Sequence, residues 1–190
     1  VMAEIHGKSG DWAKAVELYR GFAKAFPKAA VLQVKASLLA AKGILAQRAE
    51  AYAEAGPLLA AVVRDFKRLP ATDREGVARH WAAEARFLEG DALYKKMKEV
   101  QLELPEAVFR KRIKTKAEWQ VKAEATYMEV FGFKSDRWSA AGATRVGDLY
   151  VEFSEALYRV PIPEELNPDE QEIYRALIDE VAFPLQEKAI

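Results

Sequence analysis

The sequence predicts an all-α protein, on two observations. Apolar residues recur at the spacing of a helical face along most of the chain, and no run of alternating β-branched residues marks a strand. Glycine and proline are sparse and separate the helical segments. We expect helices over residues 1–8, 11–26, 28–42, 44–68, 72–102, 105–132, 136–159 and 168–190.

The boundaries of these helices follow from local residue chemistry. Gly7 to Asp11 forms the first inter-helix turn, and Pro27 ends the second helix because proline cannot continue one. Gly43 separates the third helix from the fourth. Gly56-Pro57 is expected to break or kink the fourth helix, and Pro184 is expected to do the same to the last.

The longest loop is Pro161 to Asp169, PIPEELNPD. Asn167 and Pro168 supply a helix start, and Asp169 and Glu170 then place acidic groups at the positive end of the helix dipole. The last helix therefore begins at residue 168.

Composition limits the function classes. The chain has 190 residues, of which 51% are apolar and 31% are charged, so it can bury a sizeable core. Lys+Arg and Asp+Glu number 29 each, so no bulk attraction to nucleic acid or anionic lipid is expected. There is no cysteine, which excludes disulfides and thiol catalysis. No uninterrupted apolar span of about 20 residues is present.

The segment 10–27, GDWAKAVELYRGFAKAFP, combines a turn, one packed helical face and a closing proline. It resembles helix B of a tetratricopeptide repeat (TPR). The matching residues are Gly10, Asp11, Trp12, Ala15, Val16, Tyr19 and Pro27. Phe22 departs from the family, which prefers Ala there, and Ala3 falls at the small position of helix A. This alignment starts the chain inside a repeat, so we expect a fragment of a longer array with further repeats upstream.

Later segments repeat the resemblance more loosely. Helix-A spacing fits Ala143, Val146, Gly147 and Tyr150, as well as Gly90 with Tyr94, and helix-B spacing fits Ala123, Tyr127 and Val130. The small glycine of helix A lets the two helices of a hairpin approach. Several helices are longer than a 34-residue repeat allows. The resemblance implies one TPR-like domain over residues 1–190, an α-solenoid of antiparallel hairpins with over-long helices.

The final third, RVGDLYVEFSEALYRVPIPEELNPDEQEIYRALIDEVAFPLQEKAI, is similar to divergent TPR arrays of myxobacterial and related deltaproteobacterial envelope proteins, some of them in gliding-motility machinery. This similarity implies an assembly role in the periplasm or envelope rather than the cytoplasm. The TPR resemblance as a whole implies a non-catalytic protein–protein interaction scaffold, whose partner is another protein or peptide.

The family lines its concave groove with a set of helix-A positions. Carried over through Gly90 and Gly147, they nominate these partner-binding residues: Glu84, Phe87, Asp91, Tyr94, Thr144, Asp148, Val151 and Glu152. Such a groove is mostly acidic with aromatic anchors. It would suit a peptide or helix that carries Lys or Arg beside a large apolar residue.

Catalytic and cofactor motifs are weak. Gly7-Lys8-Ser9 matches the tail of a phosphate-binding loop, but Met2 occupies the place of its first glycine. His80 and Glu84 share a helix face yet give a metal only two ligands, fewer than a zinc site needs. Acidic pairs such as Glu164-Glu165 lie in an expected loop. We expect no enzyme, no cofactor and no metal.

Charge is segregated along the chain. Basic residues crowd the middle, above all in 110–116, RKRIKTK, and acidic residues crowd the end. The basic run with Trp119 could contact nucleic acid or acidic lipid, but we expect a solvated helix face or a complement to the acidic end. Two alternatives to a scaffold stay open: a structural or oligomerising segment, and lipid or nucleic-acid contact through this helix.

Overall fold

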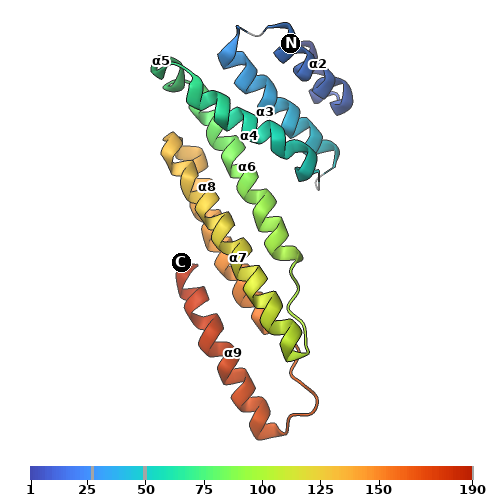
Figure 1. Cartoon of the computed structure of the whole chain (residues 1–190), viewed down its shortest axis with the longest axis vertical. Helices are drawn as coiled ribbons and strands as arrows, with labels where there is room; N and C mark the ends of the chain where they lie inside the picture. The colour runs from blue at the N-terminus through green and yellow to red at the C-terminus, as the bar shows by residue number, and fades with distance from the viewer. Residues whose placement is uncertain (27, 49–50, 190) are drawn as a thin grey trace. The chain divides into compact units, whose positions relative to one another are not determined.

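A computed structural model of the chain describes residues 1–26, 28–48 and 51–189. Over these residues the protein is all-α, as predicted, with no strand (Figure 1). The helices are α1 (Met2–Lys8), α2 (Trp12–Ala25), α3 (Ala30–Gln47), α4 (Tyr52–Arg68), α5 (Ala71–Arg74), α6 (Ala78–Glu99), α7 (Glu106–Val130), the 3-10 turn η1 (Phe131–Phe133), α8 (Asp136–Tyr158) and α9 (Pro168–Lys188).

The chain divides into two compact units. Unit 1 consists of Val1–Glu89 and Glu129–Ser139, and unit 2 of Gly90–Met128 and Ala140–Ile190. Helices α6, α7 and α8 therefore contribute residues to both units. The single TPR-like domain over residues 1–190 and its solenoid arrangement remain predictions.

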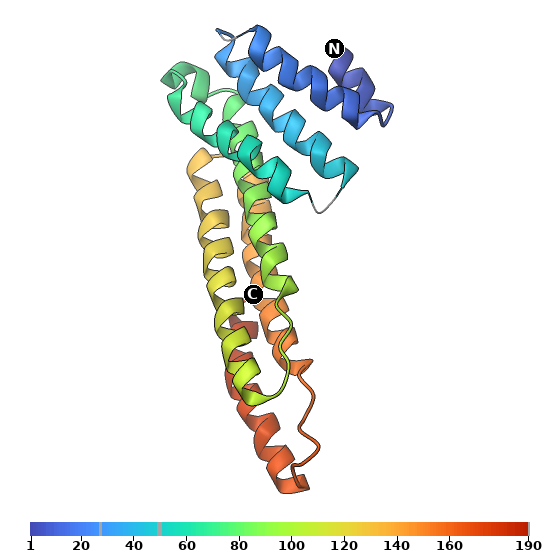
Figure 2. The ribbon, with the colours of Figure 1, turned by 45° about the vertical axis from the view of Figure 1, so that its right-hand side comes forward.

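Unit 1 contains α1 to α4, in which α1 contacts α2, α2 contacts α3 and α3 contacts α4 (Figures 1 and 2). Aliphatic and alanine side chains from α2, α3, α4 and α6 form its core. The buried members of this core are Val16, Val34, Leu38, Ala41, Ile44, Ala55, Leu59, Val62, Val63, Phe66, Leu69, Ala78, Ala82 and Ala85. The core is thus built almost entirely by apolar burial.

The first helical hairpin follows the sequence prediction closely. Asp11 caps α2 by accepting a hydrogen bond from the Lys14 backbone N–H at 3.2 Å, and Gly10 has the positive φ of 84° that the preceding turn requires. Ala15 and Val16 are buried on the predicted face of α2. Pro27, the predicted terminator, lies outside the described residues.

The expected break at Gly43 is wrong, because α3 continues through it to Gln47. A Cβ at position 43 would lie 2.7 Å from Cγ2 of Val16, so the glycine allows α3 to approach α2 closely. Its small size therefore serves packing inside a helix rather than helix termination.

Neither internal proline interrupts its helix. α4 runs without a break through Pro57, and α9 does so through Pro184. In α4 the complete burial of Leu59 and Val62 just beyond the proline offsets the lost backbone hydrogen bond. The expected helix over 72–102 is in turn divided by a short turn at residues 75–77 into α5 and α6.

Unit 2 packs α9 antiparallel to α8. The hydroxyl of Tyr158 donates a hydrogen bond to Asp179 at 3.0 Å, and a Cβ at Gly147 would lie 3.0 Å from the carbonyl oxygen of Ala189. Gly147 therefore lets the end of α9 approach α8 closely, which agrees with the predicted role of a small residue between two consecutive antiparallel helices. Gly90 also permits a hairpin contact, because a Cβ there would lie 2.5 Å from the Tyr127 ring.

The start of α9 confirms the predicted helix signal. Asn167 accepts a hydrogen bond from the Glu170 backbone N–H at 3.0 Å, and the Glu170 carboxylate accepts one from the Asn167 N–H at 2.9 Å. This reciprocal pair is a capping box, with Pro168 at the first helical position. Along α9 only Ala182 is fully buried, while Tyr174 and Ile178 are half-buried, so the cap adds to a small number of tertiary contacts.

Candidate functional site

The predicted partner-binding residues divide between the two units. Glu84 and Phe87 belong to unit 1. The other six belong to unit 2: Asp91, Tyr94, Thr144, Asp148, Val151 and Glu152. Their geometry is therefore described unit by unit.

In unit 1 both predicted residues have partners inside the fold. The carboxylate of Glu84 on α6 pairs with the Lys42 ammonium on α3, and its side chain is 16% exposed. Phe87 is 8% exposed, and its ring lies 5.1 Å from the ring of Trp138. These side chains therefore contribute to packing between helices of unit 1.

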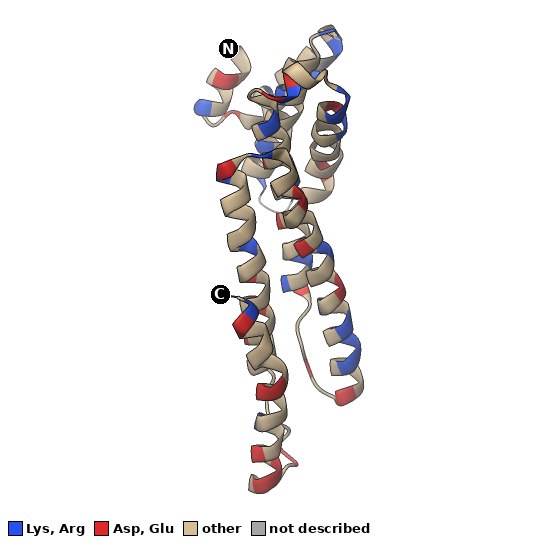
Figure 3. Cartoon of the chain, turned by 90° about the vertical axis from the view of Figure 1, so that its left-hand side faces the viewer, with Lys and Arg blue, Asp and Glu red and all other residues tan. Residues whose placement is uncertain are grey.

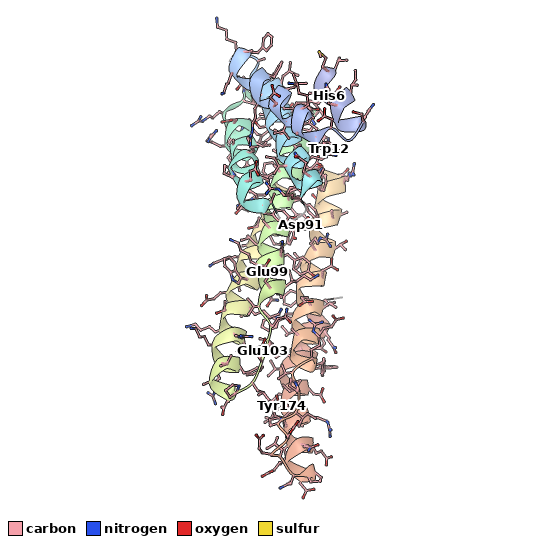
Figure 4. All side chains as sticks on the ribbon, turned by 90° about the vertical axis from the view of Figure 1, so that its right-hand side faces the viewer. His6, Trp12, Asp91, Glu99, Glu103 and Tyr174 are labelled. Carbon is pink, nitrogen blue, oxygen red and sulfur yellow. The ribbon has the colours of Figure 1, made fainter. Side chains whose placement is uncertain are left out.

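In unit 2 the two predicted aspartates share one guanidinium. Asp91, labelled in Figure 4, accepts hydrogen bonds from the Tyr127 hydroxyl at 2.7 Å and from Arg145 Nε at 3.1 Å. Arg145 Nη1 also donates to Asp148 at 2.9 Å. Burial raises the pKa of Asp91, and the bonds from Tyr127 and Arg145 oppose that shift.

Three further predicted residues lie along α6 and α8. The Tyr94 hydroxyl lies 3.4 Å from the backbone oxygen of Asp148, and burial with nearby carboxylates raises the pKa of Tyr94 to about 12. Thr144 donates to the carbonyl of Ala140 in its own helix at 3.2 Å. Val151 is 42% exposed. Of the three, only Thr144 and Val151 present exposed side chains.

Glu152 lies between two cations of unit 2. Lys116 Nζ is 3.2 Å from its carboxylate and Arg159 Nη2 is 3.0 Å from it. Lys116 is only 1% exposed and also donates to the backbone oxygens of Met97 and Val100 at 3.0 and 3.3 Å. Burial lowers the pKa of Lys116, and Glu152 partly opposes this. Lys116 is therefore a buried helix clamp: it pairs with a carboxylate of the acidic end, as one of the two expectations for the basic run has it, and it does not lie on a solvated face.

The weak metal candidate has no ligand geometry. His80 Nδ1 is 2.7 Å from the Ser135 hydroxyl, and Glu84 is paired with Lys42. Among the described residues, no group of three or more His, Asp or Glu side chains could hold a metal ion. Gly7 and Lys8 are the last two residues of α1, so the inter-helix turn begins at Ser9 rather than at the predicted Gly7.

The largest concave feature described in unit 2 is an apolar groove of about 1030 Å³ that the sequence did not predict. One wall is formed by the start of α7 and the residues before it, and the other wall is formed by α9. Residues 163–166, which lie in the loop between α8 and α9, complete the lining. The lining residues are Leu104, Pro105, Glu106, Phe109, Arg110, Ile113, Leu157, Pro163, Glu165, Leu166, Tyr174, Leu177, Ile178, Glu180 and Val181. We call this surface the α7–α9 groove. None of the predicted partner-binding residues lines it.

The charges that line the α7–α9 groove are mainly acidic. Glu106 is neutralised by Arg110, whose Nε lies 2.8 Å from its carboxylate. In the described part of the chain, Glu165 and Glu180 have no cationic partner. Figure 3 shows acidic residues along α9 and basic residues along α7. The groove therefore carries unpaired negative charge beside an apolar wall.

Comparisons with known proteins add no relative. No family model, no curated protein and no solved structure matches the chain. None of the helices described is long and apolar enough to cross a membrane.

Proposed function

We propose that this chain is a non-catalytic protein–protein interaction scaffold within a multi-protein assembly. The observation that carries the proposal is the α7–α9 groove, a solvent-open apolar concavity of about 1030 Å³. Apolar surface left in contact with water is unfavourable, and large patches of this kind are typical of interaction sites. Three side chains of α9 extend this patch, since Ile173, Leu177 and Val181 are between 50% and 61% exposed.

The perturbed ionisable groups support a scaffold over an enzyme. Asp91, Lys116 and Tyr127 have shifted pKa values, but each is hydrogen-bonded within the helix packing of unit 2. Catalytic groups need to reach a substrate in a cleft. The α7–α9 groove contains none of these three residues.

The setting rests on resemblance alone. The similarity of the final third to myxobacterial envelope TPR arrays, together with the TPR-like first hairpin, supports an assembly of the bacterial cell envelope, in the periplasm and in gliding-motility machinery. A TPR-type scaffold would present its binding surface to one or more proteins of that assembly.

A structural or oligomerising segment is the second candidate. The exposed apolar row Ile173, Leu177 and Val181 favours it, because a second copy of the chain could cover the same row. Such a segment would assemble with itself and need no separate ligand.

The test is comparative capture. The chain and a groove variant, Leu177→Asp with Val181→Asp, are immobilised and exposed to lysate of the chain's own organism, and retained proteins are identified by mass spectrometry. A scaffold retains specific proteins that the variant loses. Sedimentation measured over a range of concentrations is run in parallel. Self-association without any retained protein would favour the structural segment, and the absence of both would contradict the proposal.

A further inference from the structure

The wall of the α7–α9 groove has the layout of a helix-binding surface. α9 presents Leu177 and Val181 to the groove, and Phe109 and Ile113 of α7 line the other wall. Tyr174, labelled in Figure 4, also lies on the groove side of α9. The groove is therefore lined by two helices whose apolar side chains leave space between them.

The exposed row on α9 has helical periodicity. Ile173, Leu177 and Val181 lie four residues apart, so they form a nearly straight ridge about 12 Å long at 1.5 Å per residue. A ridge of i, i+4 side chains packs into the equivalent groove of another helix. This spacing fits a helical occupant better than an extended peptide, which would require an open strand edge.

The charge around the groove favours an occupant with positive charge. Residues 161–190 contain eight acidic and two basic side chains, and Glu165 and Glu180 line the groove without a cation among the described residues. Basic side chains flanking the apolar stripe of a partner would meet these carboxylates. Such complementarity accelerates association and fixes orientation.

The chain's own basic helix is a poor occupant. On α7, the described large apolar side chains that are exposed are Val121 and Met128, at 65% and 54%. They are interspersed with Lys114 and Lys122, and two side chains cannot fill the groove. The α9 of a second copy would supply a continuous aliphatic row, but it would also bring its acidic side chains to the carboxylates of Glu165 and Glu180, so a different protein with basic flanks is the favoured occupant.

We propose that the α7–α9 groove binds an amphipathic helix of another protein, one with large aliphatic residues at i, i+3 or i+4, and i+7, flanked by Lys or Arg. This inference rests on the proposed scaffold function and names the chemistry of its partner. The aliphatic stripe packs between α7 and α9, and the flanking cations pair with Glu165 and Glu180.

The probe is a fluorescein-labelled synthetic helix of about 18 residues, with a leucine stripe on one face and lysines elsewhere. Two control peptides are used: one of the same composition with the leucines scattered around the helix, and one with glutamate in place of lysine. Fluorescence anisotropy against the whole chain is expected to show saturable binding of the stripe peptide, with each control at least about tenfold weaker.

Variants of the chain assign the site. Glu165→Lys with Glu180→Lys is expected to weaken binding about tenfold, whereas the matched pair Glu172→Lys with Glu187→Lys changes it less than about twofold. The matched residues are exposed and do not line the groove. Leu177→Ser removes an apolar contact from a 56% exposed position and is expected to weaken binding without unfolding the chain, which circular dichroism checks.

The peptide assay would overturn the inference if the stripe peptide did not bind, if a control peptide bound equally well, or if both charge pairs lost binding equally. Sedimentation that showed a second copy occupying the groove would overturn it as well. Failure of the inference can be distinguished from failure of the proposed function. If the peptide does not bind but the wild type and the groove variant capture the same proteins, the chain is still a scaffold, with a binding surface outside the groove.

Discussion

The two units of this chain stabilise their cores differently. Unit 1 buries a continuous cluster of aliphatic and alanine side chains from α2, α3, α4 and α6. Unit 2 also buries apolar residues, but it includes Lys116, Gln120, Thr126 and Ser154 among them, whereas the buried polar residue described in unit 1 is Ser135, which is bonded to His80. An apolar core depends on volume and shape, whereas a buried polar group depends on a specific partner. We therefore expect unit 2 to be the more sensitive to changes that leave a polar atom without a partner.

The largest expected effect is at Lys116 in unit 2. Lys116→Ala is expected to lower the free energy of unfolding by about 3–5 kcal/mol, because it removes a buried cation that Glu152 and two backbone carbonyls share. Lys116→Met keeps most of the volume and is expected to cost less, about 1–2 kcal/mol. Urea unfolding followed by circular dichroism measures both. Equal and small losses would show that the clamp contributes little.

The same residue gives a pH test. Burial lowers the pKa of folded Lys116 below its ordinary value of 10.5. Between these two pKa values the unfolded chain binds more protons, so the stability contributed by Lys116 rises as pH increases through that window. The stability difference between the wild type and Lys116→Met should therefore shift in favour of the wild type from neutral to alkaline pH. A shift in the opposite direction would contradict the burial of a charged lysine.

Glycines at close helix approaches provide a matched comparison between the units. Gly90→Ala in unit 2 would place a Cβ 2.5 Å from the buried Tyr127 ring, and we expect a loss of about 2–3 kcal/mol. In Gly43→Ala in unit 1 the one close contact of the added Cβ is a Val16 methyl at 2.7 Å, with Trp12 at an ordinary 3.5 Å, so a loss nearer about 1 kcal/mol is expected.

Gly56→Ala in α4 is the control for this comparison. Beyond its chain neighbours a Cβ at position 56 meets nothing within 4 Å, but the ring of Pro57 disfavours a Cβ in the α region at the residue before it, so the gain in helix propensity is largely offset and we expect a change below about 0.5 kcal/mol. Urea unfolding ranks the three variants. If Gly90→Ala were as harmless as Gly56→Ala, the tight packing of α6 on Tyr127 would be wrong.

The hydroxyl of Tyr127 tests the polar core more finely. Tyr127→Phe removes the 2.7 Å hydrogen bond to Asp91 and should cost about 2 kcal/mol, because a buried carboxylate loses a donor. Tyr150→Phe removes a 3.0 Å bond to Glu124 on a part-exposed residue and should cost less than about 1 kcal/mol. Thermal unfolding of both variants measures the contrast. Equal losses of stability would mean that the hydrogen bond from Tyr127 to the buried Asp91 contributes no more than the bond from Tyr150 to Glu124.

Local chemistry predicted much of the fold. Asn167 is predicted to start a helix because a short polar side chain at that position can accept a backbone N–H, and Asp11, which the sequence places in a turn, caps α2 in the same way. Gly43 was misinterpreted because sequence alone does not distinguish a helix end from a close approach of two helices. In the structure that distinction depends on Val16, 27 residues earlier in the chain.

The periodicity of α7 contains a signal for the burial of Lys116. The spacing of Phe109, Ile113, Lys116, Gln120, Ala123, Tyr127 and Val130 alternates between four and three residues, the period of a buried helix stripe. Grouping Lys116 with its basic neighbours hid this register. The α7–α9 groove had only the exposed row of α9 as a signal, because its volume depends on how loosely α9 packs, with one buried residue.

The smallest expected effect compares the caps of α2 and α9. Asn167→Ala removes one half of a capping box, and Asp11→Ala removes a single cap bond, so each should cost about 1 kcal/mol. The length of helix that is loosened by each substitution should differ between α2 and α9. α2 is also held by the buried Ala15 and Val16, whereas α9 buries only Ala182.

Hydrogen exchange measured helix by helix separates these cases. Loss of the Asn167 cap should accelerate exchange throughout the first turns of α9 by about fivefold, because few tertiary contacts oppose local opening there. Loss of the Asp11 cap should affect only the first turn of α2, since the buried residues of that helix still hold it closed. Equal spread in both helices would mean that α9 is held by more than its cap and Ala182. If α9 is held so firmly, the wall of the groove is a preformed binding surface rather than one that becomes ordered when its partner binds.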